Sequence, residues 1–266
     1  YSMQAENKQL TVLFSDVRGF TSISENLKAN ELSELINEIL SPITKIIHDN
    51  NGTIDKYMGD AVMAFWGAPI NDDKHASNAL KTALAITPAM HKLSAEFEAK
   101  GWPPIKLGVG LNTGIMSVGN MGSEFRVAYT VLGDAVNLGS RLEGLTKQYG
   151  VDLIVSEFTK DAAPEFTYKE LDKVRVKGKL EPIKIYEPLG LTTTLTDTTL
   201  KDLAIHEQAI ELYQQQQWIS AQALFSTLAQ QAPECLINQI YLERIETFIQ
   251  HPPESPWDGA YTHTSK

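Results

Sequence analysis

Residues 9–16, QLTVLFSD, predict a buried strand that ends in an acidic residue. The segment is rich in β-branched and aromatic side chains, and the polar turn VRGFT at residues 17–21 closes it. Leu and Ile then recur at three- and four-residue spacing over residues 30–50. That spacing predicts an amphipathic helix after the first strand.

A second pair of elements follows in the same order of strand and helix. Residues 52–67, GTIDKYMGDAVMAFWG, predict two strands joined by a tight turn at residues 58–60. A helix over about residues 72–100 comes next, with Asp72 or Asp73 available as its cap. The order strand, helix, hairpin, helix, strand predicts an α+β fold with a ferredoxin-like split βαβ core, whose helices pack on one face of a mainly antiparallel sheet.

The rest of the chain divides into the end of this domain and a helical tail. Six further strands and a short helix are expected, the helix at 135–149 and the strands at 105–114, 116–122, 126–134, 151–157, 166–178 and 182–189. They complete a domain at 1–190, which a linker at 191–200 follows. Residues 201–250 predict a small α-helical hairpin similar to one tetratricopeptide repeat, and 251–266 an irregular tail. Since a lone repeat cannot bury its own faces, we expect it to pack on the first domain or on a partner.

Composition narrows the class of protein. The chain has 266 residues, of which 42% are hydrophobic and 21% charged, and this excludes collagen-like and disordered chains. A single cysteine, Cys235, allows no internal disulfide and predicts a reducing, cytoplasmic location. No run approaches 18 consecutive apolar residues. The chain begins without Met, so an upstream sensory or membrane domain in a membrane-tethered parent protein is an expectation.

The distribution of charge bears on the ligand. The net charge is −10; residues 1–190 hold 20 basic and 24 acidic residues, a net charge of −4, and residues 191–266 carry the other −6. Binding to nucleic acid or to an anionic membrane needs a basic field that this chain does not supply. We therefore expect no nucleic-acid partner, and metal ions with a few placed cations would have to hold any anionic ligand.

Two aspartates are candidates for holding those metal ions. Asp16 ends the first strand and Asp60 lies in the hairpin turn, and these strands are neighbours in a split βαβ core. Two convergent carboxylates suit Mg²⁺, which prefers oxygen ligands and keeps positions for phosphate oxygens. Taken singly, each residue has a structural explanation, because an Asp after a strand often caps a helix and one after Gly often occupies a turn.

Four ordered motifs narrow the choice. They are FSDVRGFT at 14–21, DKYMGDA at 55–61, YTVLGDAVNLGSR at 129–141, and VKGK at 176–179 followed by PIKIY at 182–186. Together they resemble the catalytic domain of class III nucleotidyl cyclases over about residues 8–190. Within this family the chain resembles the bacterial adenylate cyclases that read the base with a Lys/Thr pair.

The resemblance assigns the metal and phosphate ligands. It implies that Asp16, Asp60 and the backbone carbonyl of Val17 bind two Mg²⁺ ions, with Mn²⁺ as an alternative. The turn that contains Gly19, Phe20 and Thr21 leads toward a helix, and its N–H groups are suited to the β- and γ-phosphates.

The resemblance also assigns the residues that recognise the nucleotide base. Lys56 and Thr130 match the pair that reads adenine, since Lys only donates hydrogen bonds whereas Thr can also accept them. Guanylyl cyclases of this family have Glu in place of this lysine, and Glu accepts from guanine. ATP is therefore the expected substrate, although one pair discriminates modestly.

Three further positions match residues that act on the ribose and phosphates. Asn137 and Arg141 are four residues apart on a predicted helix, so they share a face. A solvated polar stripe would also have this spacing. The resemblance implies that Asn137 orients the ribose, that Arg141 stabilises charge on the α-phosphate, and that Lys177 contacts the β- and γ-phosphates.

These assignments predict an adenylyl cyclase that makes 3′,5′-cyclic AMP and pyrophosphate by two-metal attack of the ribose 3′-OH. In this family the metal and base-reading residues of one site come from different subunits, which implies a homodimer. A guanylyl cyclase and a catalytically silent regulatory or dimerisation module are the alternatives. The sequence does not identify the general base, and bicarbonate or other regulation is equally unassigned.

Overall fold

A computed structural model describes residues 4–264 of the chain. It divides into two compact units. The first extends to residue 147 and includes 151–164, and the second comprises 148–150 and the chain from residue 165 onward. Each unit is described by itself.

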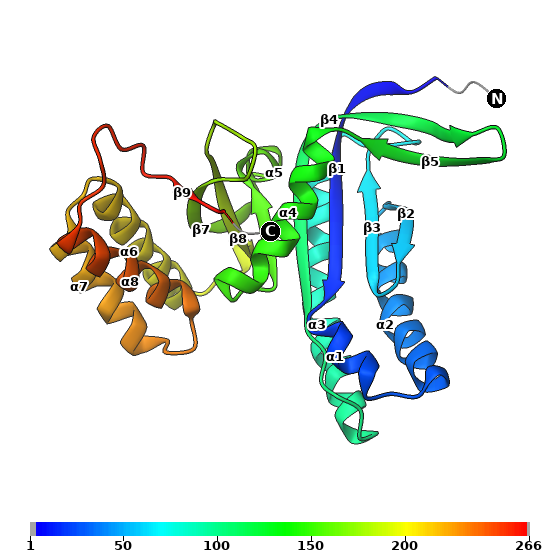
Figure 1. The fold of residues 1–266 in the computed structure, drawn as a ribbon, viewed down its shortest axis with the longest axis horizontal. Helices are drawn as coiled ribbons and strands as arrows, with labels where there is room; N and C mark the ends of the chain where they lie inside the picture. Colours follow the sequence, from blue (N-terminus) through cyan, green and yellow to red (C-terminus); the bar gives the residue numbers. More distant parts are fainter. Residues whose placement is uncertain (1–3, 265–266) are drawn as a thin grey trace. The chain divides into compact units, whose positions relative to one another are not determined.

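The first unit is built on a sheet whose central strand is the one predicted at residues 9–16. Its strand order is β2-β3-β1-β4-β6, with β5 paired to β4. The strands are β1 (Glu6–Val17), β2 (Thr53–Met58), β3 (Ala61–Trp66), β4 (Leu107–Ser123), β5 (Arg126–Leu132) and β6 (Leu153–Ser156). β1 runs antiparallel to both β3 and β4 (Figure 1), and β4 and β6 are parallel.

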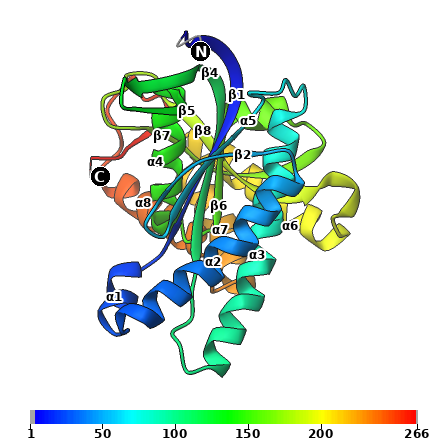
Figure 2. The ribbon, with the colours of Figure 1, turned by 90° about the vertical axis from the view of Figure 1, so that its right-hand side faces the viewer.

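The two long helices lie side by side on one face of this sheet, α2 (Ala29–Asp49) and α3 (His75–Ala99) (Figure 2). α2 buries its apolar stripe, Leu35, Ile39, Ile43 and Ile47. The predicted α+β fold is confirmed, including the hairpin of β2 and β3 and both long helices. Neither Asp72 nor Asp73, which we expected as alternative caps, caps α3: its N-cap residue is Lys74, without a side-chain cap, and Asp72 accepts a hydrogen bond from the Lys74 N–H.

Helix α4 (Asp134–Tyr149) packs closely against β1 and β4. A Cβ at Gly110 of β4 would lie 2.4 Å from the backbone nitrogen of Glu143, and a Cβ at Gly139 of α4 would lie 2.8 Å from the Val12 side chain. Only glycine permits an approach this close. Thr11, which points to the face opposite Val12, bonds His75 of α3, so α3 and α4 cover opposite faces.

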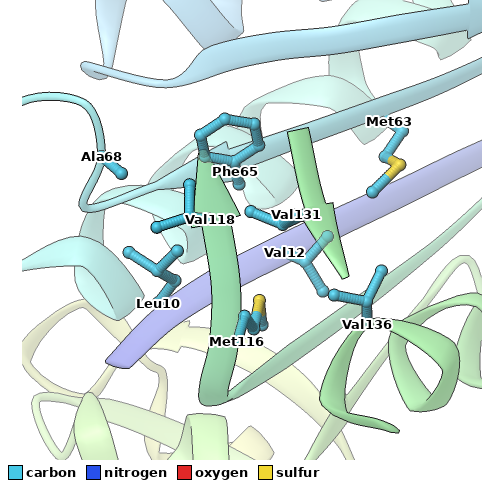
Figure 3. Close-up of a cluster of buried hydrophobic side chains, with 9 residues drawn as sticks. All are labelled: Leu10, Val12, Met63, Phe65, Ala68, Met116, Val118, Val131 and Val136. Carbon is cyan, nitrogen blue, oxygen red and sulfur yellow. The ribbon is translucent and has the colours of Figure 1, made fainter. Parts of the chain in front are cut away.

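The buried cluster on the α4 side of the sheet joins β1, β3, β4, β5 and the start of α4 (Figure 3). Its members are Leu10, Val12, Met63, Phe65, Ala68, Met116, Val118, Val131 and Val136. Burying such side chains contributes roughly 1.5–3 kcal/mol each for the larger ones. The cluster therefore holds β5 and α4 against the central strand.

Some elements of the first unit differ from the prediction. The strands expected at 105–114 and 116–122 form one continuous strand, β4, because it pairs with β1 from Val17↔Leu107 to Glu6↔Val118. Two short helices, α1 (Phe20–Glu25) and α5 (Glu157–Ala162), were not assigned from the sequence. With six residues each, they are too short to show a clear periodicity.

The second unit combines three strands with three helices. The strands β8 (Ile183–Leu191) and β9 (Tyr261–Thr262) both pair with β7 (Phe166–Arg175). The helices are α6 (Asp197–Gln214), α7 (Trp218–Gln231) and α8 (Leu236–Gln250), and α6 packs on β7. Thus β7 and β8, which we expected in the domain at 1–190, cluster with the tail helices, and the helical tail packs on a strand of this chain.

The boundaries around these helices also differ from the expectation. The linker expected at 191–200 is ordered, since a 3₁₀ turn at Thr192–Thr194 follows β8 and α6 begins at Asp197. The Thr196 side chain caps α6 by accepting from the Thr199 N–H. In the tail expected to be irregular, residues 261 and 262 form β9, and 265–266 lie outside the described residues.

A buried carboxylate organises the second unit. Asp172 of β7 has no exposed surface, and Arg244 of α8 donates to both of its oxygens at 3.0 and 2.7 Å. Tyr149 also donates to Asp172, because burial and the Asp172 charge raise the pKa of that phenol well above its ordinary value. Because the only hydroxyl proton of Tyr149 already points to Asp172, the His263 Nε2–H donates to the Tyr149 oxygen, at a distance of 2.8 Å. One carboxylate thus ties together β7, α8 and the C-terminal segment.

Replacing Asp172 with Asn should destabilise the chain strongly. The substitution leaves the Arg244 guanidinium buried without its counter-charge, which costs about 3–5 kcal/mol in comparable sites. Urea unfolding followed by circular dichroism measures the free energy. The exposed Asp202→Asn is the matched control and should change it by about 0.5 kcal/mol or less. Equal stability of the two variants would contradict the role given to Asp172.

Among the described residues, none of the helices combines the length and the apolar character needed to cross a bilayer.

Candidate active site

The first unit brings Asp16 and Asp60 together at one end of β1. Asp16 is the next to last residue of β1, and Asp60 lies in the turn between β2 and β3. The pairing of Ser15 with Val62 sets that turn beside the end of β1. The Val17 N–H donates to Asp60 Oδ2 at 3.0 Å, which fixes the Asp60 carboxylate against the strand.

The two carboxylates repel each other in a partly buried place. Burial, followed by the hydrogen bond with Asp60 and its charge, raises the pKa of Asp16 to about 7. Glu143 of α4 adds to this effect, and burial raises its own pKa to about 7 as well. The cation nearby, Arg18, donates to the Val151 carbonyl and lies 3.8 Å from Asp152. The pair therefore carries negative charge that a cation would relieve.

These groups fit a divalent metal ion. Asp16, Asp60 and the Val17 carbonyl are hard oxygen donors of the kind that Mg²⁺ and Mn²⁺ take. Within residues 4–264, no group of three or more His, Cys, Asp and Glu side chains is arranged to hold a metal. The chain would thus supply two acidic ligands, and phosphate oxygens or water would complete the coordination.

The turn after β1 differs in its backbone from an ordinary strand end. Gly19 adopts a φ of +65°, in the left-handed region, and forms the N-cap of α1. Phe20 and Thr21 are the first two residues of that short helix. The first N–H groups of a helix have no partner within it, so this turn offers donors just beyond Asp16.

The structure joins Lys56 and Thr130 through a third residue. Thr130 of β5 donates to Asp55 Oδ2 at 2.6 Å, and Lys56 Nζ of β2 lies 3.6 Å from Asp55 Oδ1. Thr130 is buried, whereas the Lys56 side chain is 48% exposed. The two residues matched to base recognition therefore meet in one place, although they are far apart in sequence.

The other candidates lie at separate positions. Asn137 and Arg141 are exposed on α4, one turn apart. Lys177 is exposed between β7 and β8 and belongs to the second unit. Asp16 pairs with Gly108 near the start of β4, whereas Thr130 pairs with Gly119 near its other end.

Sequence reasoning gave no role to Asp55 and Glu143, two acidic residues of this site. Asp55 stands inside the DKYMGDA motif, and an acid next to a base-reading lysine is the signal that could have identified it. Glu143 lies two residues after Arg141, and nothing in the local pattern distinguishes it from a solvated helix residue. Its importance arises from the approach of α4 to β4 at Gly108 and Gly110.

Comparison with known proteins identifies the family. The model of the family described as "Adenylate and Guanylate cyclase catalytic domain" matches residues 3–187 of this chain. The chain belongs to this family, as the four sequence motifs implied. Domains of the family generally use divalent metal ions and act on nucleotides as dimers.

Individual relatives agree with the family. The adenylate cyclase of Anabaena cylindrica is 40% identical over 191 residues, which is 69% of this chain and 37% of that protein. The terminal-differentiation specific adenylate cyclase of Dictyostelium discoideum is 34% identical over 89% of this chain and 11% of its own length. The chain thus spans well under half the length of these curated relatives.

Solved structures show the same fold. The adenylyl cyclase CyaB from P. aeruginosa has a TM-score of 0.66 and 35% identity, covering 73% of this chain and 100% of that one. The guanylyl cyclase Cya2 has a TM-score of 0.67 and 31% identity, covering 73% and 98%. Both kinds of cyclase are therefore represented among similar structures.

Replacing Asp16 with Asn should stabilise the metal-free chain while weakening metal binding. Removing one of two repelling carboxylates stabilises the fold by about 1–2 kcal/mol, allowing for solvent screening. Thermal unfolding in a chelator should show a higher Tm for the variant. Adding Mn²⁺ should then raise the wild-type Tm, because ligands that bind only the folded state stabilise it, and should leave the variant nearly unchanged. Asp49→Asn, an exposed site on α2, is the control, and an equal Mn²⁺ response of wild type and Asp16→Asn would contradict the metal assignment.

Proposed function

We propose that this chain is an adenylyl cyclase that converts ATP into 3′,5′-cyclic AMP and pyrophosphate. The observation that carries the proposal is the meeting of Lys56 and Thr130 at the Asp55 carboxylate. An ammonium that donates and a hydroxyl that can accept match the ring nitrogen and the exocyclic amine of adenine. Guanine presents an N–H and a carbonyl at the corresponding positions, and Lys56 cannot accept from that N–H.

The remaining residues account for the reaction. The N–H groups of the turn at 19–21 hold the β- and γ-phosphates. Asn137 orients the ribose so that its 3′-oxygen faces the α-phosphorus, and Arg141 stabilises the charge that develops on the α-phosphate. The 3′-oxygen loses its proton and forms a bond to phosphorus, while the bond from phosphorus to the pyrophosphate oxygen breaks.

Asp16, Asp60 and the Val17 carbonyl would hold divalent metal ions. When bound, such ions lower the pKa of the ribose hydroxyl and stabilise the leaving pyrophosphate. The raised pKa of Asp16 supports this role, since a bound cation would relieve the repulsion between the two carboxylates.

A product assay tests the nucleotide. With Mg²⁺ or Mn²⁺, the purified chain should have a kcat/KM for the conversion of ATP into cyclic AMP at least tenfold higher than for the conversion of GTP into cyclic GMP. A factor of about ten is what we expect from one pair of hydrogen-bonding residues. Chromatography of the products measures both rates. Cyclic GMP as the main product would favour the guanylyl cyclase alternative, which the likeness to Cya2 keeps open. No product from either nucleotide would favour a silent module.

We also propose that two copies of the chain share each site. Asp16 and Thr130 pair with residues near opposite ends of β4, and Asn137 and Arg141 are exposed on α4. A homodimer would combine the metal ligands of one copy with the base, ribose and α-phosphate residues of the other. Each dimer would then contain two equivalent sites.

Mixing two inactive variants tests the shared site. Asp16→Ala and Arg141→Ala should each be inactive alone, because in a homodimer of either variant both sites lack a required side chain. After free exchange in an equal mixture, about a quarter of the wild-type activity should return, since half of the dimers are mixed and each has one intact site. Asp16→Ala mixed with Asp60→Ala is the control and should stay inactive. Failure of the first pair to recover, with both variants dimeric by light scattering, would argue against shared sites.

A further inference from the structure

The position of Asp55 depends on an irregularity in β2. Ile54 pairs with Ala64 and Lys56 pairs with Met63, so Asp55 is the extra residue of a β-bulge. In a regular strand Asp55 and Lys56 would point to opposite faces. A bulge re-aims a side chain, and here it brings the Asp55 carboxylate to the Thr130 hydroxyl while Lys56 stays within ion-pair distance.

The Asp55 carboxylate is buried and has few partners. Its side chain is 1% exposed. Oδ2 accepts from Thr130, and Oδ1 has the Lys56 ammonium at 3.6 Å as its charge partner but accepts no hydrogen bond. Burying a carboxylate is costly unless it is paired and hydrogen-bonded, so this arrangement calls for an explanation beyond packing.

The bond between Asp55 and Thr130 can have only one direction. A carboxylate only accepts, so the hydroxyl proton of Thr130 must point toward Asp55. The Thr130 oxygen then keeps only lone pairs for other partners. A group that donates, such as the exocyclic amine of adenine, can bond to it, whereas the carbonyl oxygen of guanine cannot.

We propose that Asp55 is a specificity-determining positioning residue, which orients the Thr130 hydroxyl as an obligatory acceptor and so makes the site select ATP over GTP. The inference rests on the adenylyl cyclase activity proposed above and adds the cause of its selectivity. Asp55 acts through the Thr130 hydroxyl. It touches neither the base nor the reacting phosphate.

The variant Asp55→Asn tests this role with little change of shape. An Asn amide can donate to the Thr130 oxygen as well as accept from its hydroxyl, so the Thr130 proton becomes free to turn toward the base. We expect the ratio of kcat/KM for ATP to kcat/KM for GTP to fall about tenfold, the factor typical of one hydrogen bond. Because it is a ratio, partial unfolding of the variant would not change it.

A double-mutant cycle separates positioning from a general structural effect. Thr130→Val removes the hydroxyl, so in that background Asp55→Asn should leave the ATP to GTP ratio unchanged within about twofold. Thr130→Ser keeps the hydroxyl and should preserve the selectivity with Asp55 present and lose it with Asn. Asp49→Asn, an exposed carboxylate on α2, is the matched control for loss of one negative charge.

Each outcome decides the question. An equal loss of both nucleotide activities in Asp55→Asn, with the ratio unchanged, would overturn the inference and leave Asp55 a structural residue. The same would follow if the ratio fell equally with Val at position 130. A wild-type chain that prefers GTP would overturn the proposed function itself, and that result is distinct because it is seen before any variant is made.

Discussion

Both neighbours of β1 run antiparallel to it, and this double pairing determines where the acidic residues of the site lie. The register with β3 brings the turn that holds Asp60 to the end of β1, and the register with β4 places Gly108 opposite Asp16. Because the side chains of a strand alternate, Val12 and Leu10 enter the cluster on the α4 side while Thr11 faces α3. A shift of one residue in the register with β3 would exchange these faces and separate the two carboxylates.

The electrostatics of the site follow from that packing. Glu143 joins the two aspartates because α4 approaches β4 at glycines, and burial raises the pKa of Asp16 and of Glu143. Such an arrangement lowers the stability of the metal-free chain, a cost that is common at functional sites. A chain of net charge −10 could bind a nucleoside triphosphate only where cations are recruited locally. Asp16, Asp60 and Glu143 form the part of the molecule suited to recruit them.

Much of the fold was predictable because its signals are local. The periodicity of α2 and the tight turn between β2 and β3 are each contained within a short segment, and their predicted limits agree with the structure to within a few residues. The continuity of β4 was not predictable, because pairing with β1 holds residue 115 in an extended conformation that its own neighbours do not require. The grouping of β7 and β8 with the tail helices depends on Asp172, whose partners Tyr149 and Arg244 come from distant parts of the chain.

The amino-acid sequence by itself determined the family and the chemical types of the site, because the four motifs keep their residues in a fixed order and spacing. Asp16, Asp60, Lys56 and Thr130 could each be identified in this way. Only the tertiary structure decided how these groups act on one another. The bulge that turns Asp55 toward Thr130 and the approach of α4 that brings Glu143 to the aspartates arise from contacts between segments far apart in the chain, and local patterns of hydrophobicity and charge carry no record of such contacts.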